Sequence, residues 1–318
     1  MSQPSHRPGR LGVGVISAGR VGAVLGAALR GAGHAVVGVH ASSEASRDRA
    51  AALLPDVPVL DVQSIVERSE LVLLAVPDDQ LPGLVSGLAA TGAWQPGQLV
   101  VHTAGRYGTD VLEPVRAAGS IGLAVHPAMT FTGLSLDLQR LADCRFAVTA
   151  AAPVLPIAQA LVVEMGAEPV VVAEADRPLY HAALAHGSNH VMTVLGESMQ
   201  LLGEIGVEHP DRVLGPLVRA TVDNALASGE NALTGPVARG DVTTVAAHVA
   251  ALRELEGGGA GAAHDAAGPV GSADHDAARQ LLAGYRALAR QTARRAAASG
   301  RLDETSYRAV MAAIEEEQ

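Results

Sequence analysis

The 318-residue chain contains no lysine and very few aromatic residues. All 23 basic residues are arginines, and 33 acidic residues bring the formal net charge to −10. Chemistry that requires a lysine amine is therefore excluded. A chain without a basic face is also not expected to bind nucleic acid or an anionic membrane surface. Because aromatic residues make up only 2% of the chain, its core must be built from small and branched aliphatic side chains.

Cysteine and long apolar runs are also scarce. Cys144 is the only cysteine, which excludes an internal disulfide and a cysteine-rich zinc site. No run reaches the roughly 20 apolar residues of a membrane helix, since Pro153 and Pro156 interrupt the most apolar stretch. The first ten residues have no apolar core and do not resemble a secretory signal. We therefore expect a soluble, cytoplasmic protein.

Short runs rich in Val and Leu alternate with Ala-rich stretches between residues 11 and 173. This pattern is typical of parallel strands joined by crossover helices, and near-continuous apolar strands suit a sheet covered on both faces. Strands are expected at Leu11–Ile16, Ala35–Val39, Leu71–Val76, Leu99–His102, Gly122–Val125, Cys144–Thr149 and Pro169–Val172. The pattern predicts an α/β, doubly wound, mostly parallel Rossmann domain over residues 10–173, after a flexible tail of residues 1–9.

The second half of the chain has a different pattern, because strand-like runs stop and long helical runs begin. Helices are expected over 176–203, 213–228, 243–254, 277–299 and 305–317. Residues 257–276 are rich in Gly, Ala, His and Asp and have no hydrophobic period, so they predict a flexible loop. An all-helical C-terminal domain is thus expected over residues 174–318.

A candidate phosphate-binding turn follows the first expected strand. Gly19 and Gly22 match the second and third glycines of the dinucleotide fingerprint GxGxxG, whereas Ser17 replaces the first. The second glycine lets the backbone approach a pyrophosphate, and the third lets helix and strand pack closely. The residues expected to bind the cofactor here are Ser17, Ala18, Gly19, Arg20, Val21 and Gly22. Because the first glycine is missing, a Rossmann fold that has lost its nucleotide stays open as an alternative.

Cofactor choice is normally determined at the end of the second strand, where an Asp or Glu holds the ribose of NAD. No carboxylate follows directly after that strand here, whereas Ser42, Ser43 and Arg47 are available to bind a 2′-phosphate. We therefore expect NADP in preference to NAD. The alternative for Arg47 is an exposed helix face.

Five segments carry a resemblance to known proteins: Gly19–Gly22, Leu73–Asp79, His126–Gly133, Ser188–His190 and Leu233–Asp241. As a set they resemble the proteins that join a Rossmann-like domain to domain of unknown function 2520. More distantly, the layout is similar to pyrroline-carboxylate reductase, deazaflavin-dependent NADP reductase and relatives of 6-phosphogluconate dehydrogenase. The resemblance implies an NADP-dependent oxidoreductase with a 6-phosphogluconate dehydrogenase-like C-terminal domain, which forms a homodimer through its helical domain.

The missing lysine separates these relatives. Hydroxyacid dehydrogenases and ketopantoate reductase use a helical lysine as acid and base, so their mechanisms cannot be carried over unchanged. Imine reductases need no such residue, since an iminium carbon already accepts hydride. In the relatives the nicotinamide lies at the carboxyl ends of the strands, where Val76 and Pro77 are expected to contact it. The alternative is an ordinary strand-to-helix turn with Asp78 as the helix cap.

Two histidines stand at strand ends, where ligands collect in open parallel sheets. His102 ends one expected strand and His126 follows the next, and a histidine at this edge can exchange a proton near neutral pH. Structural histidines with satisfied hydrogen bonds remain the alternative. The resemblance adds Asn189 as an active-site residue, and helical spacing allows His181 and Asn189 to line one edge of a pocket.

A polar turn at residues 234–244 resembles the turn that holds the substrate carboxylate in pyrroline-carboxylate reductase. Arg239, Thr243 and Thr244 are expected to bind an anionic substrate there, with a capped helix start at a dimer interface as the alternative. We expect no metal site, because His186 and His190 share a helix face but no third ligand has motif spacing.

These expectations define one leading hypothesis and two alternatives. The leading hypothesis is an NADP-dependent oxidoreductase that transfers hydride to a small, anionic C=N or C=O substrate, with His126 and Asn189 as catalytic residues. The expected substrate-binding residues are His102, His181, Arg239, Thr243 and Thr244. The alternatives are a non-catalytic nucleotide sensor and an enzyme that exchanges hydride between NADP and a deazaflavin.

Overall fold

The computed structural model of the protein describes residues 10–256 and 272–316. The chain divides into two compact units, residues 1–189 and 190–318, and helix α8 (Arg177–Glu204) crosses that boundary. The tail expected at residues 1–9 and the loop expected from residue 257 to 271 lie outside the described residues. Residues 272–276, which the sequence assigned to the same loop, are the start of helix α12 (Ser272–Ala298).

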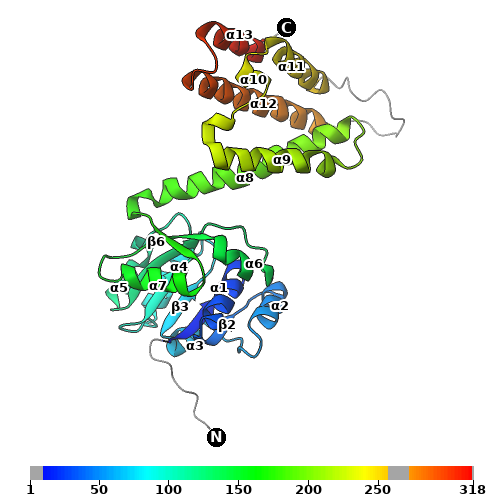
Figure 1. Cartoon of the computed structure of the whole chain (residues 1–318). Coiled ribbons are helices and arrows are strands. Elements are labelled where there is room, and N and C mark those ends of the chain that lie inside the picture. The colour runs from blue at the N-terminus through cyan, green and yellow to red at the C-terminus, as the bar shows by residue number, and fades with distance from the viewer. Residues whose placement is uncertain (1–9, 257–271, 317–318) are drawn as a thin grey trace. The chain divides into compact units, whose positions relative to one another are not determined.

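The first unit is built on a seven-stranded sheet whose strand order is β2-β1-β3-β4-β5-β6-β7. Figure 1 shows this unit in blue to green. The strands are β1 (Gly12–Ile16), β2 (Ala35–His40), β3 (Leu71–Leu74), β4 (Leu99–His102), β5 (Ile121–Pro127), β6 (Arg145–Thr149) and β7 (Glu168–Val171). All neighbouring strands are parallel except β5 and β6. The predicted doubly wound, mostly parallel Rossmann sheet is therefore confirmed.

Helices cover both faces of this sheet because its strands are apolar on both sides. In β1, Val13 and Val15 pack with α1 and α7, whereas Ile16 packs with α3, α4 and α5 on the opposite face. The helices of this unit are α1 (Arg20–Gly31), α2 (Glu44–Leu53), α3 (Val62–Arg68), α4 (Leu81–Ala90), α5 (Glu113–Ala117), α6 (Leu136–Arg140) and α7 (Leu155–Glu164). Short 3-10 turns precede α5 and β6, at Asp110–Leu112 and Leu141–Asp143.

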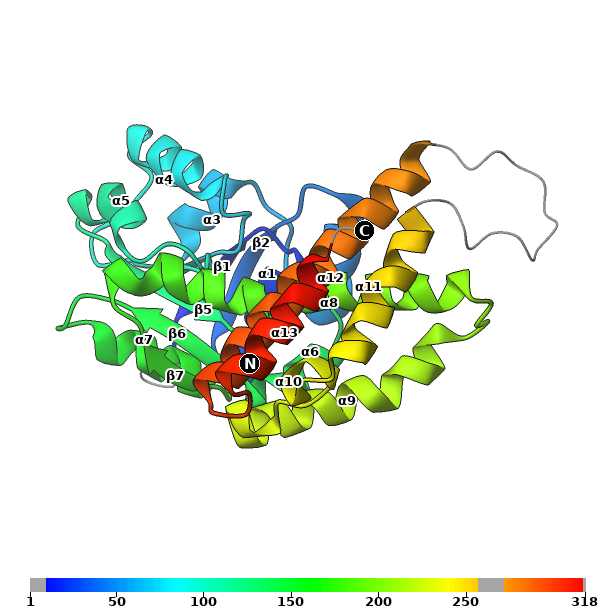
Figure 2. The same cartoon turned by 90° about the horizontal axis from the view of Figure 1, so that it is seen from above.

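The second unit is helical throughout its described residues. After α8 it contains α9 (Pro210–Ser228), α10 (Pro236–Arg239), α11 (Val242–Glu256), α12 and α13 (Glu304–Glu315). Helices α11, α12 and α13 lie side by side (Figure 2). They share a core that includes Val245, Ala293 and Ile314. Alanines on α12 leave room for the larger side chains of its neighbours, as expected for a chain poor in aromatic residues. No helix in the described ranges combines the length and apolar character needed to cross a membrane.

The strand order fixes where a ligand can bind. Strand β2 pairs with one edge of β1, and the next strand in the chain, β3, pairs with its other edge. The order of strands in the sheet therefore reverses its direction at β1. In open α/β sheets, ligands bind in the crevice outside the carboxyl ends of the strands at such a switch point. The carboxyl ends of β1, β3, β4 and β5 meet at this edge, because these four strands are parallel.

Candidate functional site

The turn after β1 has the geometry of a phosphate-binding loop. Ser17 adopts the left-handed conformation, with φ of 75°, that the first glycine of the fingerprint normally supplies. A Cβ on Gly22 would lie 2.1 Å from the carbonyl oxygen of Ser17 and 2.9 Å from the Cβ of Ala75, so only glycine fits where α1 crosses the strands. Beside Gly19, by contrast, the Ser17 hydroxyl at 3.6 Å is the sole group within 4 Å of such a Cβ in the described part of the chain, apart from the glycine's own chain neighbours and helix backbone, which leaves space for a ligand.

The N-terminus of α1 is open to an anion. Its N-cap residue is Gly19, no side chain caps it, and its first turn contains no acidic residue. The first amides of a helix need partners and carry a partial positive charge, so an uncapped N-terminus beside a glycine turn suits a phosphate group. The residues present therefore fit the diphosphate of a dinucleotide.

A cleft of about 430 Å³ extends from this turn across the strand ends. Its residues come from the segments after β1, β3 and β4, from the end of β5 and from α8. They are Ser17, Gly19, Arg20, Val21, Ala75, Val76, Pro77, Asp78, Thr103, Gly105, His126 and His181. Of the residues expected to bind the cofactor, Val76 and Pro77 and four residues of the turn thus line one cleft.

A second cavity of about 200 Å³ adjoins the cleft. It lies between the end of β5 and α8, and its lining residues include His126, Thr130, His181, Ser188 and Asn189. His126 and His181 therefore line both spaces, whereas Asn189 lines the second cavity alone. The predicted juxtaposition of His181 and Asn189 along one edge is what the structure has.

His126 is the centre of a small cluster of polar rings. Its Nδ1 lies 2.9 Å from the hydroxyl of Tyr180, and its ring centre is 5.8 Å from that of His181. Gly105 closes the cluster from the opposite side, because a Cβ there would lie 2.5 Å from Cδ2 of His181 and 2.9 Å from Nε2 of His126. The backbone of Gly105 thus sets how far both rings reach into the cleft.

Burial keeps two members of this cluster, His126 and Tyr180, uncharged. Burial is the largest of the causes that lower the pKa of His126 to about 4, and the nearby His181 and Arg177 lower it further. Burial likewise raises the pKa of Tyr180 to about 12, so its phenol stays protonated. At neutral pH the Tyr180 hydroxyl can therefore donate to Nδ1 of His126, which places the ring proton on Nε2. In that tautomer, an uncharged N–H donor lies near Gly105.

Arg177, at the first position of α8, anchors this arrangement to the sheet. Its side chain is fully buried; Nη2 donates to the carbonyl oxygens of Ala124 and Ala147, and Nε donates to the hydroxyl of Thr149. These contacts fasten α8 across β5 and β6, three residues before Tyr180. Nη1 of Arg177 is buried and has no hydrogen-bond partner among the residues that the structure describes. The sequence contains no pattern that reveals a buried arginine, and this residue was not among those predicted.

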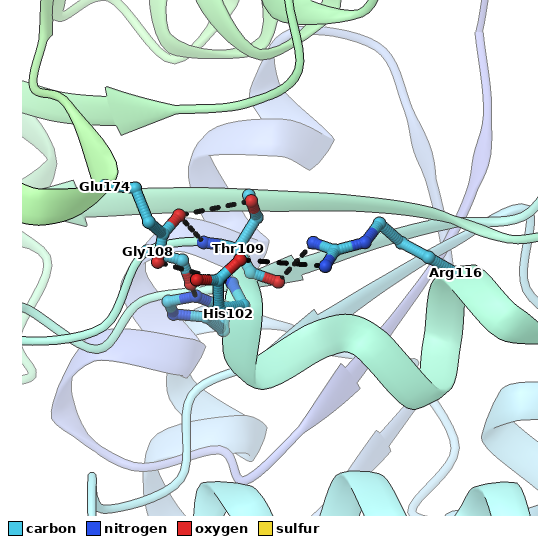
Figure 3. Close-up of polar contacts among 6 residues, drawn as sticks. His102, Gly108, Thr109, Arg116 and Glu174 are labelled. Carbon is cyan, nitrogen blue, oxygen red and sulfur yellow. Dashed lines mark hydrogen bonds and ion pairs between the residues drawn. The ribbon is translucent and has the colours of Figure 1, made fainter.

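His102 lies away from both spaces. It is fully buried, its Nε2 is 2.7 Å from the carbonyl oxygen of Gly108, and its Nδ1 accepts from the amide of Ala104 (Figure 3). Burial is the main cause that lowers its pKa to about 4. Both ring nitrogens of His102 are hydrogen-bonded to the backbone, as in a structural histidine, which was the alternative to a substrate-binding role. His102 lines neither the cleft nor the second cavity.

The carboxylate of Glu174 connects the start of α8 to the same loop (Figure 3). It accepts hydrogen bonds from the backbone amides of Thr109 and Asp110 and from the Thr109 hydroxyl, while Arg116 donates to the carbonyl oxygen of Thr109. Together with Arg177, this contact holds the segment that carries Tyr180 and His181.

The residues expected to bind a 2′-phosphate lie at the start of α2. Ser43 is the N-cap of this helix, and its hydroxyl accepts from the amide of Ser46. Arg47 donates to the carbonyl oxygen of Ser42 over 3.3 Å. None of these residues lines the cleft. Ala18 and Gly22, from the turn itself, are buried beneath it.

The remaining predicted residues belong to the second unit. Arg239, at the end of α10, is exposed and lies 3.4 Å from the hydroxyl of Thr234. Thr244 donates through its amide and its hydroxyl to Asp241, which caps the start of α11. Thr243 is exposed beside it. The helix start in this turn is therefore capped, as the structural alternative supposed, and an arginine and a hydroxyl stay accessible.

A Rossmann sheet with an uncapped glycine turn at its switch point is the architecture of dinucleotide-binding proteins. Residues 1–127 match the family model of the Rossmann-like domain, and residues 144–292 match that of domain of unknown function DUF2520. The chain therefore carries a Rossmann-like domain followed by a DUF2520 domain, as its motifs predict. No curated protein matches it.

Solved structures share this fold at low sequence identity. One is a provisionally named NADP oxidoreductase from Bacteroides fragilis, which is 19% identical to this chain. The match covers 86% of this chain and 98% of the oxidoreductase, with a TM-score of 0.65. An imine reductase from a Pseudomonas species is 17% identical, and the match covers 95% of this chain and 99% of the reductase, with a TM-score of 0.56. Pyrroline carboxylate reductase from Plasmodium falciparum, solved with NADP bound, is 11% identical. The match covers 94% of this chain and 98% of that reductase, with a TM-score of 0.53. At these identities the likeness establishes the fold alone.

Proposed function

We propose that the protein is an NADP-dependent oxidoreductase that transfers hydride to a small C=N or C=O substrate. The observation that carries the proposal is that His126 and His181 line both the cleft at the phosphate turn and the second cavity. A nicotinamide in the cleft and a substrate in the second cavity would meet at these two side chains. The similar folds of an NADP oxidoreductase and an imine reductase support this chemistry.

Under this proposal, the turn at Ser17 and Gly19 and the amides at the start of α1 hold the diphosphate, while Val76 and Pro77 contact the nicotinamide. The cofactor, when bound in its reduced form, supplies the hydride. We assign NADP rather than NAD because no carboxylate directly follows β2. Arg47 is the proposed partner of the 2′-phosphate.

The proposed role of His126 is that of an uncharged hydrogen-bond donor. With the Tyr180 hydroxyl as donor to Nδ1, the ring proton would lie on Nε2, and this N–H would be available to the substrate or to the nicotinamide amide. Asn189 and His181 would orient the substrate in the second cavity. No lysine is needed in this arrangement, which agrees with a chain that has none.

We further propose that the substrate carries an anionic group. Arg239 is exposed and could pair with a carboxylate, and the accessible hydroxyl of Thr243 is a second donor. The hydroxyl of Thr244 already donates to Asp241, so its contribution would be through the capped helix start.

A homodimer formed through the helical unit is part of the proposal. Helix α9 buries none of its residues, although Leu217 and Leu226 are 64% and 84% exposed. Met192, on the part of α8 that belongs to the same unit, is 68% exposed. Apolar side chains exposed in such number on adjoining helices are typical of a protein interface.

The test is oxidation of NADPH by the purified protein with panels of keto acids and cyclic imines. Turnover that is lost in His126→Gln, with NADPH binding retained, is the expected result. Complete inactivity across both panels would contradict the proposal, and binding of NADPH without turnover is the result expected of a nucleotide sensor. Tighter binding of NADH than of NADPH would contradict the choice of cofactor.

A further inference from the structure

Asp78 lies in the turn between β3 and α4 and lines the cleft next to Val76 and Pro77. Its sequence position also allows a cap of the following helix. In the structure, however, α4 begins at Leu81, its N-cap is Gln80, and no side chain caps it. Asp78 is therefore free of the structural role that its position suggests.

The carboxylate of Asp78 has unused hydrogen-bonding capacity. Its Oδ2 is buried and has no hydrogen-bond partner in the described part of the chain, while the side chain as a whole is 33% exposed and so reaches the cleft. The nearest cation is Arg106, whose Nε is 3.9 Å from Oδ2. Arg106 is held instead by the ring of Tyr107, 4.4 Å from its Cζ. At this distance Arg106 makes no hydrogen bond to Oδ2, and water screens the pair because both side chains are partly exposed, so Arg106 does not satisfy the buried oxygen.

Among the described residues, Asp78 forms no ion pair with the other ionisable groups of the cleft, which are Arg20, His126 and His181. Arg20 belongs to the phosphate turn. His126 is uncharged because it is buried. Asp78 is thus the negative group at the part of the cleft where Val76 and Pro77 are expected to contact the nicotinamide. A carboxylate in a partly enclosed space favours a cation over a neutral group of the same shape.

We propose that Asp78 selects a cationic hydride acceptor, a protonated C=N group, over a neutral C=O group. Its carboxylate would accept a hydrogen bond from the N–H of the iminium. This inference rests on the proposed function and names the substrate class of that same site. Asp78 is then a specificity-determining residue.

The chemistry of the two acceptors differs in a way that fits this site. The iminium carbon gains one hydrogen with its two electrons, the C=N π pair becomes the lone pair of a neutral amine, and the nicotinamide is oxidised. The amine then takes its proton from water, so no protein acid is consumed. A carbonyl acceptor would instead form an alkoxide, which the carboxylate of Asp78 would destabilise and which would require a proton from the protein.

The test compares two ring compounds of nearly equal shape, pyrrolidinium, which is positively charged, and tetrahydrofuran, which is neutral. Their binding to the NADP-saturated protein is measured by calorimetry for the wild type, Asp78→Asn and the neighbouring control Asp79→Asn. We expect the wild type and Asp79→Asn to prefer pyrrolidinium, and Asp78→Asn to bind it about tenfold more weakly or worse, with tetrahydrofuran unaffected. Thermal melting checks that each variant is folded, and Asp78→Ser replaces Asp78→Asn if the latter is not.

Equal binding of the two compounds by the wild type would overturn the inference, and so would unchanged pyrrolidinium binding in the folded Asp78 variant. NADPH oxidation with 1-pyrroline and with cyclopentanone separates this inference from the proposed function. A clear preference for the cation without turnover of any acceptor would remove the proposed function and leave the role of Asp78 standing. Turnover of cyclopentanone that equals that of 1-pyrroline would remove the role of Asp78 and leave an oxidoreductase.

Discussion

Substitution of Ser17 by glycine is predicted to stabilise the first unit. Ser17 holds a φ of 75° at the position where the dinucleotide fingerprint normally has its first glycine. A residue with a Cβ loses about 1–2 kcal/mol in the left-handed region. Glycine avoids that cost but gives up about 0.5–1 kcal/mol because its unfolded chain is more flexible. With the middle of each range, about 1.5 and about 0.75 kcal/mol, the net gain for Ser17→Gly is about 0.75 kcal/mol.

The assay is thermal unfolding of the full chain, followed by circular dichroism, in the absence of cofactor. For a domain of this size, the expected gain raises the melting temperature by about 1–4 °C. Ser17→Ala is the matched control, because it removes the hydroxyl and keeps the left-handed strain, so it should produce no increase. Ser17→Val should lower the melting temperature, because a β-branched side chain is less tolerant of positive φ. Equal shifts in the glycine and alanine variants would refute the reasoning, since the strain would then not be the cause.

Three further predictions follow from the same structure. Gly105→Ala should displace His126 and His181, and turnover should fall at least about tenfold because reacting groups are misplaced, while NADPH binding is retained. The control is Gly87→Ala, on an open face of α4. Equal activities of the two variants would contradict the assigned packing. His102 titrates at about 4 in the folded chain and near 6.5 when unfolded, so the unfolded state binds more protons between these values. The contribution of His102 to the free energy of unfolding should thus be fully present above pH 6.5 and should fall by about 3 kcal/mol toward pH 4. In a folded His102→Gln variant, the free energy of unfolding should depend less steeply on pH over this range. Leu217→Glu should convert the proposed dimer to monomer in light scattering, and a monomeric wild type would remove that proposal.

The fold was predictable from the sequence because its signals are local. All seven expected strands are present, since each is a short run rich in apolar residues between turn residues. For the central strands β3 and β4, which are buried throughout, such a run is the pattern of a strand covered on both faces. The reversal of β6 against β5 was not predictable, because it depends on how the segment between them crosses the sheet. The end of the expected loop at residues 272–276 was assigned incorrectly, because Ser, Ala, Asp and His at a helix start have no hydrophobic period.

The candidate site was predictable only in part. His126 and His181 meet because a strand end and a helix start are both visible in the sequence, and helical spacing then brings Asn189 to the same cavity. His102 has the same sequence signal as His126 but points into the protein, where the carbonyl oxygen of Gly108 satisfies it. Which of two strand-end histidines faces the cleft is decided by the loop that follows each strand, and loop conformation has no periodic signature.

Gly105 and Arg177 show why the missing residues could not be found in the sequence. The role of Gly105 is the absence of a side chain, which becomes visible only when the rings it would displace are in place. Arg177 acts through backbone carbonyl oxygens of β5 and β6, which every residue has. Both residues act on His126 from outside the cavity that it lines with Asn189. Substitutions confined to the residues that line that cavity would therefore not reveal their roles. Arg177→Met should change the pH dependence of turnover, because the buried guanidinium is one of the charges that lower the pKa of His126.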